Sequence, residues 1–129
     1  MTTPAGGDHG PARGLVERIG GPARVRAILD VLYARLFADP WVGFFFAGRE
    51  RDTIVAGQLA FLLKAFGHTD AFAGRHPSVA HDALPPIREG HFDRRLVVLR
   101  EVLESEGLEP ADVEAWLRVE RGMRAAIQK

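Results

Sequence analysis

The sequence of 129 residues contains no cysteine. This absence excludes disulfide bonds, thiolate catalysis and cysteine-ligated zinc or iron–sulfur sites. Neither sign of charge is in excess, because 17 basic residues balance 17 acidic ones, and this balance gives no reason to expect a nucleic acid partner. No apolar run approaches the roughly 18 residues of a membrane span. The first residues also lack the apolar core of a secretory signal. We therefore expect a cytoplasmic protein.

What the sequence does contain is typical of one globular domain. Apolar residues make up 47% of the chain, which is too many for a disordered protein. Glycine and proline are concentrated at the start, in "MTTPAGGDHGPARG". We interpret residues 1–11 as a flexible N-terminal tail and residues 12–129 as a single domain.

Apolar residues recur at helical spacing through most of this domain, and no segment alternates as a β-strand would. The pattern predicts an all-α protein. The expected helices are Ala12 to Ile19, Pro22 to the Asp39-Pro40 break, Arg51 to Phe66, a short one within 77–83, Glu89 to Ser105, and a last one within 108–127.

Two polar residues interrupt the apolar faces of these helices. Tyr33 lies among leucines on the second predicted helix, and Gln58 lies among Ile54, Phe61 and Leu62 on the third. Buried polar groups need hydrogen-bond partners. Either Tyr33 and Gln58 bond to each other or to a backbone carbonyl, or they line a pocket whose ligand takes these hydrogen bonds.

The histidines also allow two interpretations, as ordinary surface or hydrogen-bonded residues or as ligands of a metal. The five histidines show no zinc-binding spacing, although His76, His81 and Asp82 could be drawn as a metal cluster. A lone histidine such as His81 is usually a surface residue or one with its hydrogen bonds satisfied. In an apolar cavity, a single imidazole also fits haem, which brings its own equatorial ligands and needs one axial histidine.

Five motifs, in order, resemble the truncated haemoglobins, the short two-over-two globins, and most of all their group I. These motifs are "LVERIGG", "ILDVLYARLFADP", "FFFAG", "GQLAFLLKAFG", and "VAH" followed ten residues later by "HFD". The resemblance covers roughly Gly14 to Ile127. It implies a two-over-two helical sandwich that encloses haem b.

The resemblance also implies roles for individual residues. His81 matches the proximal histidine, which is the ligand of the haem iron. Tyr33 and Gln58 match the distal residues that act on a bound gas and would be the catalytic pair. Phe46 matches the phenylalanine on the haem face, with Phe44 and Phe45 filling the corner beneath it. The other positions that match the lining of the haem cavity are Ile54, Phe61, Leu62, Ile87, Phe92 and Leu99.

Some positions depart from the group I pattern. The stretch "HDALPPI" after His81 is closer to the "HxxLP" of group III, and Gly67-His68 stands where the family often has two glycines. Gly57 stands where group I often has a basic residue that reaches a haem propionate. Arg49, Arg51 or Arg75 is then the candidate for that role.

The implied function is binding of O2, NO and CO at a histidine-ligated haem iron. Two hydrogen-bond donors to bound O2 would hold it firmly, which suits oxygen chemistry better than delivery. The implied reaction is NO dioxygenation, or a related peroxidase activity, and it needs an unidentified reductase. A reversible oxygen binder or gas sensor and a haem-free globin-like module remain as alternatives. We expect a monomer or weak homodimer.

Overall fold

The computed structural model describes residues 14–68 and 89–123, and this part of the chain is helical without any strand. The helices are α1 (Leu15–Ile19), α2 (Pro22–Ala38), the short 3-10 helix η2 (Gly43–Phe46), α3 (Arg51–Ala65), α5 (Glu89–Ser105) and α6 (Pro110–Gly122). The all-α prediction is confirmed. The tail at residues 1–11 and the short helix within 77–83 lie outside the described residues.

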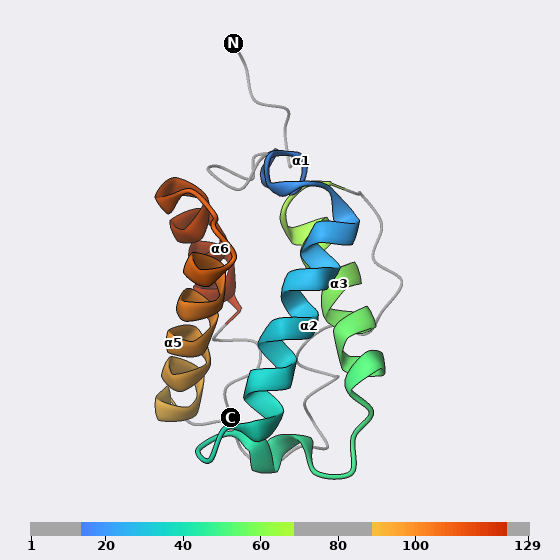
Figure 1. Cartoon of the computed structure of the whole chain (residues 1–129), viewed down its shortest axis with the longest axis vertical. Coiled ribbons are helices and arrows are strands. Elements are labelled where there is room, and N and C mark those ends of the chain that lie inside the picture. Colours follow the sequence, from blue (N-terminus) through green and yellow to red (C-terminus); the bar gives the residue numbers. More distant parts are fainter. Residues whose placement is uncertain (1–13, 69–88, 124–129) are drawn as a thin grey trace.

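The helices form two pairs. Figure 1 shows α2 and α3 side by side, next to a second pair made by α5 and α6, with α1 at one end of α2. Helix α2 is central because it packs against α1, α3, α5 and η2. This arrangement is the predicted two-over-two sandwich.

The core lies between the two pairs. Most apolar residues that recur at helical spacing on α2 and α5 are buried, and Val113, Trp116 and Leu117 of α6 are buried as well. The largest fully buried side chains belong to Trp116, Phe66, Phe92 and a group of leucines with Ile28. Helix ends also agree closely with the sequence pattern: α5 spans the predicted residues, and α2 ends before Asp39.

The start of the first helix was predicted too early. Gly14 has a φ of 76°, in the left-handed region, and α1 begins only at Leu15. Glycine adopts this conformation without steric cost. The apolar pattern cannot reveal such a local backbone reversal, which is why the prediction extended back to Ala12.

No helix in the described ranges is long and apolar enough to cross a membrane.

Candidate functional site

The corner between α2 and α3 is the 3-10 helix η2, which contains the three consecutive phenylalanines. A 3-10 helix has three residues per turn, so consecutive side chains point in three different directions. Phe45 points into the core and is buried. Phe46 lies at the edge of the core, where it stacks on Phe37 with ring centroids 4.7 Å apart. It also forms a T-shaped contact with the Tyr33 ring, with centroids 5.9 Å apart.

The third phenylalanine does not fill the corner as expected. Phe44 is 51% exposed. Its ring contacts the tilted ring of Phe45 and forms a T-shaped contact with His91. The expectation for Phe44 is therefore wrong, because the three-residue turn that buries Phe45 directs its neighbour outward. Only Phe45 and Phe46 contribute to the interior of this corner.

Tyr33 points its ring into the core from α2, with 5% of the residue exposed. Its hydroxyl oxygen accepts a hydrogen bond from Arg95 Nη2 of α5 at 3.2 Å. The guanidinium carbon of Arg95 lies 5.9 Å from the centre of the same ring. A bond from the Gln58 amide to Tyr33 is excluded, because Gln58 Nε2 has no hydrogen-bond partner within the described part of the chain.

Arg95 is itself held by an acidic residue of α6. Its Nη1 atom donates to Glu120 Oε1, and Trp116 Nε1 donates to Glu120 Oε2 at 3.1 Å. Glu120 is fully buried. Burial lowers the pKa of the Arg95 guanidinium, but the charges of Glu120 and Tyr33 and the hydrogen bonds to both together raise this pKa above its ordinary value. Arg95 and Glu120 therefore form a buried ion pair, and the second guanidinium nitrogen of Arg95, Nη2, reaches Tyr33.

Gln58 lies on the face of α3 that also carries Ile54 and Phe61. These three residues are half-buried, whereas Val55 and Leu62 are buried. The Nε2 atom of Gln58 is buried and donates to no described residue. A buried amide that lacks a hydrogen bond costs about 1–3 kcal/mol, so this atom needs an acceptor other than the groups of residues 14–68 and 89–123.

The remaining predicted lining residues fall into two groups. Leu62, Phe92 and Leu99 are covered by protein in the core, while Phe46, Ile54 and Phe61 lie at its edge. Contact of either group with a cofactor stays a prediction. His81 and Ile87 lie outside the described residues, as do the alternative ligands His76 and Asp82 and the candidate propionate partner Arg75.

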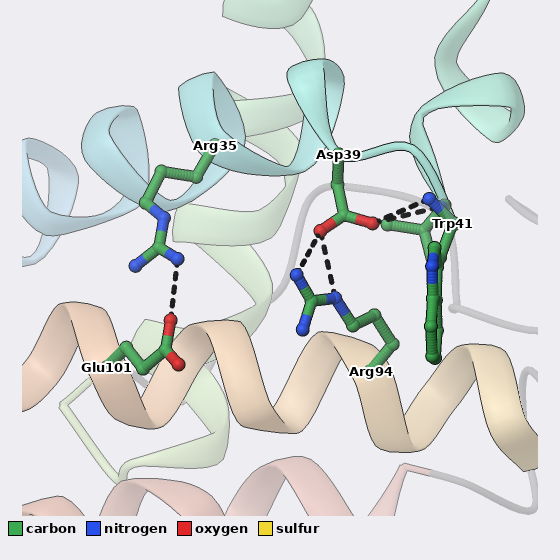
Figure 2. A network of polar contacts seen from close by, with 6 residues as sticks. Arg35, Asp39, Trp41, Arg94 and Glu101 are labelled. Atoms are coloured by element: carbon green, nitrogen blue, oxygen red, sulfur yellow. Dashed lines mark hydrogen bonds and ion pairs between the residues drawn. The ribbon is translucent and has the colours of Figure 1, made fainter.

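The corner is attached to α5 through Asp39, at the end of α2. Figure 2 shows its carboxylate between Arg94 of α5 and the backbone that begins the corner. Oδ2 accepts from Arg94 Nε at 2.9 Å and Nη2 at 2.7 Å, and Oδ1 accepts from the backbone amide of Trp41 at 2.8 Å. The hydrogen bond from Arg94 holds the pKa of Asp39 below its ordinary value, although burial opposes this shift. The same arginine lies 5.6 Å from the centre of the Trp41 ring.

Sequence reasoning missed Arg95 and Glu120, although their positions carried a signal. Arg95 lies three residues after Phe92 and four before Leu99, and Glu120 lies four residues after Trp116. Both charges therefore fall on the apolar faces of their helices. Two opposite charges on the buried faces of neighbouring helices indicate an internal ion pair.

Comparison with known proteins places this geometry in a family. The family model for bacterial-like globins matches residues 14–129. A group 1 truncated haemoglobin of Synechocystis sp. is 33% identical over 114 residues, which are 86% of this chain and 91% of that protein. A group 1 truncated haemoglobin of Chlamydomonas moewusii is 32% identical over 113 residues, 87% of this chain but 66% of that longer protein.

A solved structure agrees with these relatives. The crystal structure of the 2/2 haemoglobin from Synechococcus sp. PCC 7002, in the cyanomet state and with covalently attached haem, superposes with a TM-score of 0.77. The two are 26% identical, and the match covers 88% of this chain and 94% of the other. The chain therefore belongs to the bacterial-like globin family and, within it, to the group 1 truncated haemoglobins.

Proposed function

We propose that this globin binds haem and, through it, the diatomic gases O2, NO and CO, and that it oxidises NO to nitrate. The observation that carries the proposal is the buried Nε2 atom of Gln58, which has no protein acceptor in the described ranges and lies on a half-buried apolar face. A gas molecule bound beside this face would provide the missing acceptor.

The residues of the site fit haem, a large, flat and mostly apolar group. Phe46, Ile54 and Phe61 offer apolar surface at the edge of the core, and Tyr33 and Gln58 add hydrogen-bond donors. We assign His81 as the protein ligand of the iron, and Arg49 and Arg51, which are exposed near the start of α3, or Arg75, as partners of the propionates. When bound, haem b would supply the iron that binds the gas and exchanges electrons.

Tyr33 and Gln58 act on the gas as hydrogen-bond donors. O2 held by a haem iron would carry partial negative charge, so each hydrogen bond that Tyr33 or Gln58 donates to it would be charge-assisted and contribute about 1.5–3 kcal/mol. Since roughly 1.4 kcal/mol is a tenfold change in an equilibrium constant, two such donors slow the release of O2 by orders of magnitude. Ile54 cannot donate, so it contributes shape and keeps water out.

The reaction that suits a firmly held O2 is its addition to NO. One NO, one O2 and one electron give one nitrate ion, so an external reductase must supply the electron for each turnover. The protein's part is to hold O2 through Tyr33 and Gln58 until NO arrives. Reversible binding of O2 would use the same donors but would consume no electrons.

Haem binding is tested by the absorption spectrum of the purified protein. We expect a Soret band that corresponds to one haem per chain. His81→Gly should lose most of the haem or need added imidazole to retain it, whereas His76→Gly should keep the parent spectrum. A parent-like ferrous spectrum in His81→Gly would show that the ligand is wrongly assigned.

The reaction is tested by steady-state consumption of NO in the presence of O2 and a reductase system. We expect nitrate in a one-to-one ratio with NO over many turnovers. The variant Gln58→Leu should turn over more slowly, because it removes one donor to O2. Consumption that stops after one NO per haem, with the reductase active, would instead indicate a protein that only binds O2.

A further inference from the structure

Arg95 approaches the proposed gas site from α5, on a different element from either distal donor. We infer that Arg95 is a positioning residue, which orients the Tyr33 hydroxyl so that its proton points to the bound gas. The inference rests on the proposed function, because it assigns a role to a residue behind the proposed distal donor. It is carried by the hydrogen bond of 3.2 Å between Arg95 Nη2 and the Tyr33 oxygen.

The direction of this hydrogen bond is decided by chemistry. A guanidinium has five N–H donors and no acceptor, so the Tyr33 oxygen must be the acceptor. The hydroxyl proton of Tyr33 then cannot be used toward Arg95 and is directed elsewhere. Accepting a hydrogen bond from a cation also polarises the hydroxyl and makes it a stronger donor.

Glu120 explains why Arg95 can hold this position. The carboxylate pairs with one arm of the guanidinium and is fixed on its other oxygen by Trp116 Nε1. Both partners are largely covered, with side-chain exposures of 15% for Arg95 and 0% for Glu120. Because Arg95 is largely buried and its guanidinium is held by Glu120, it loses the rotational freedom of a surface arginine. Its second arm is therefore a fixed donor to Tyr33.

A purely structural ion pair would account for the contact between Arg95 and Glu120. It would not account for the hydrogen bond that Arg95 Nη2 donates to Tyr33. The neighbouring pair, Arg94 with Asp39, provides a contrast on the same helix. Arg94 uses Nε and Nη2 on a single carboxylate oxygen and lies over the Trp41 ring. Neutralising this pair removes an interhelical ion pair without removing the donor to Tyr33, which makes it a matched control.

The test compares two double variants of the haem-loaded protein. Arg95→Met with Glu120→Gln removes the pair without leaving a lone buried charge, and the glutamine oxygen still accepts from Trp116. Arg94→Met with Asp39→Asn is the control. We expect the first variant to raise the O2 dissociation rate by roughly three- to tenfold, part of the contribution of one charge-assisted donor, and the control to stay within about twofold of the parent.

Two spectroscopic measurements separate positioning from a general loss of structure. The C–O stretching band of the CO form should shift to higher frequency in the Arg95 variant and stay in place in the control. Tyr33 is the sole tyrosine in the chain, so ultraviolet resonance Raman spectra report its hydroxyl alone. They should show the loss of the accepted hydrogen bond only when Arg95 is replaced. If the double variant does not hold haem, Arg95→Lys can replace it in both measurements. This variant keeps the buried charge but loses the planar second arm of the guanidinium, and it should show the same shift of the C–O band and the same loss of the hydrogen bond to Tyr33.

A mutant cycle that combines the Arg95 variant with Tyr33→Phe decides whether Arg95 acts through the Tyr33 hydroxyl. If Arg95 acts through the hydroxyl, its replacement has no further effect on O2 dissociation in the Tyr33→Phe background. An equal effect in both backgrounds would overturn the inference. So would an unchanged O2 rate in the Arg95 variant while Tyr33→Phe alone raises it. If Tyr33→Phe itself changes nothing, it is the proposed role of Tyr33 that fails.

Discussion

At the scale of single residues, the three phenylalanines of the corner have three different environments. Phe46 stacks on Phe37 and touches Tyr33, whereas Phe44 is 51% exposed. We predict that Phe46→Ala speeds the transfer of haem to apomyoglobin by at least roughly tenfold. Replacing a buried phenylalanine by alanine costs about 3–5 kcal/mol in a packed core, and somewhat less at the edge of the core, where Phe46 lies. Phe44→Ala is the control and should transfer haem at the parent rate. Equal rates in the parent and Phe46→Ala would place the haem contact on Phe45 instead.

Tyr33 allows a second prediction at this scale. Tyr33→Phe removes the hydroxyl and keeps the ring that packs on Phe46. It should raise the O2 dissociation rate, measured by CO replacement in stopped flow, by at least roughly tenfold, which is the contribution of one lost donor. Bound CO carries less charge and should respond less. A rate within about twofold of the parent would contradict the role of Tyr33, since roughly 1.4 kcal/mol corresponds to tenfold.

At the scale of elements, the corner depends on how closely η2 approaches the end of α2. A Cβ atom on Gly43 would lie 2.7 Å from the backbone oxygen of Phe37, which is too close. We predict that Gly43→Ala lowers the free energy of unfolding in urea by about 1–3 kcal/mol, the usual cost of overpacking. Gly57, in the middle of α3, has open space around it.

Gly57→Ala is therefore the matched control for Gly43→Ala. It should leave stability unchanged or raise it by about 0.5–1 kcal/mol, because alanine favours a helix interior. Similar losses in both variants would show that the approach of η2 to Phe37 is not what makes Gly43 necessary.

Asp39 joins two elements, and its charge makes this contact pH-dependent. Its pKa is lowered from an ordinary value of 3.8, first of all by the hydrogen bond from Arg94. A lowered pKa in the folded state means that the contact stabilises the protein above pH 3.8 and that this contribution is lost as the pH falls through the folded-state value. We predict that Asp39→Asn, which keeps an acceptor for the Trp41 amide, is less stable than the parent near neutral pH.

The pH profile of urea unfolding checks this prediction. The difference in unfolding free energy between the parent and Asp39→Asn should be constant above about pH 5 and shrink on acidification. Asp30→Asn on α2 is a control that should change this profile little, since no hydrogen bond or ion pair of Asp30 occurs in the described part of the chain. A difference that does not depend on pH would show that the charge of Asp39 is unimportant.

At the scale of the whole molecule, two helix pairs meet along α2 and α5 (Figure 1). Haem that binds only the folded protein stabilises it by mass action, by about 2.7 kcal/mol when free haem is at 100 times its dissociation constant. We predict that the midpoint of thermal unfolding, followed by far-ultraviolet circular dichroism, rises with added haem and falls when haem is extracted. Metal-free protoporphyrin IX is a control that would keep the apolar contacts but cannot form the proposed bond between iron and His81, and it should stabilise less. A midpoint that does not respond to haem would contradict the proposed cofactor.

Much of this fold was predictable from the sequence by itself. The bounds of α5, the end of α2 at Asp39-Pro40 and the start of α6 at Pro110 follow from helical spacing, proline and glycine. The inward positions of Tyr33 and Gln58 were also visible, because each interrupts an apolar stripe on its own helix. These features are local: they depend on residues within one or two turns of each other.

Only the tertiary structure decided which polar groups meet. The partner of Tyr33 is Arg95, 62 positions further along the chain, and the charge that holds Arg95 comes from α6. Periodicity places each of these residues on a face, but the packing of α2 against α5 and of α5 against α6 brings the faces together. The same holds for Phe44 and Phe45, which are identical neighbours in the sequence. Their exposure differs because the direction of a side chain in η2 is set by how that short helix packs against α2.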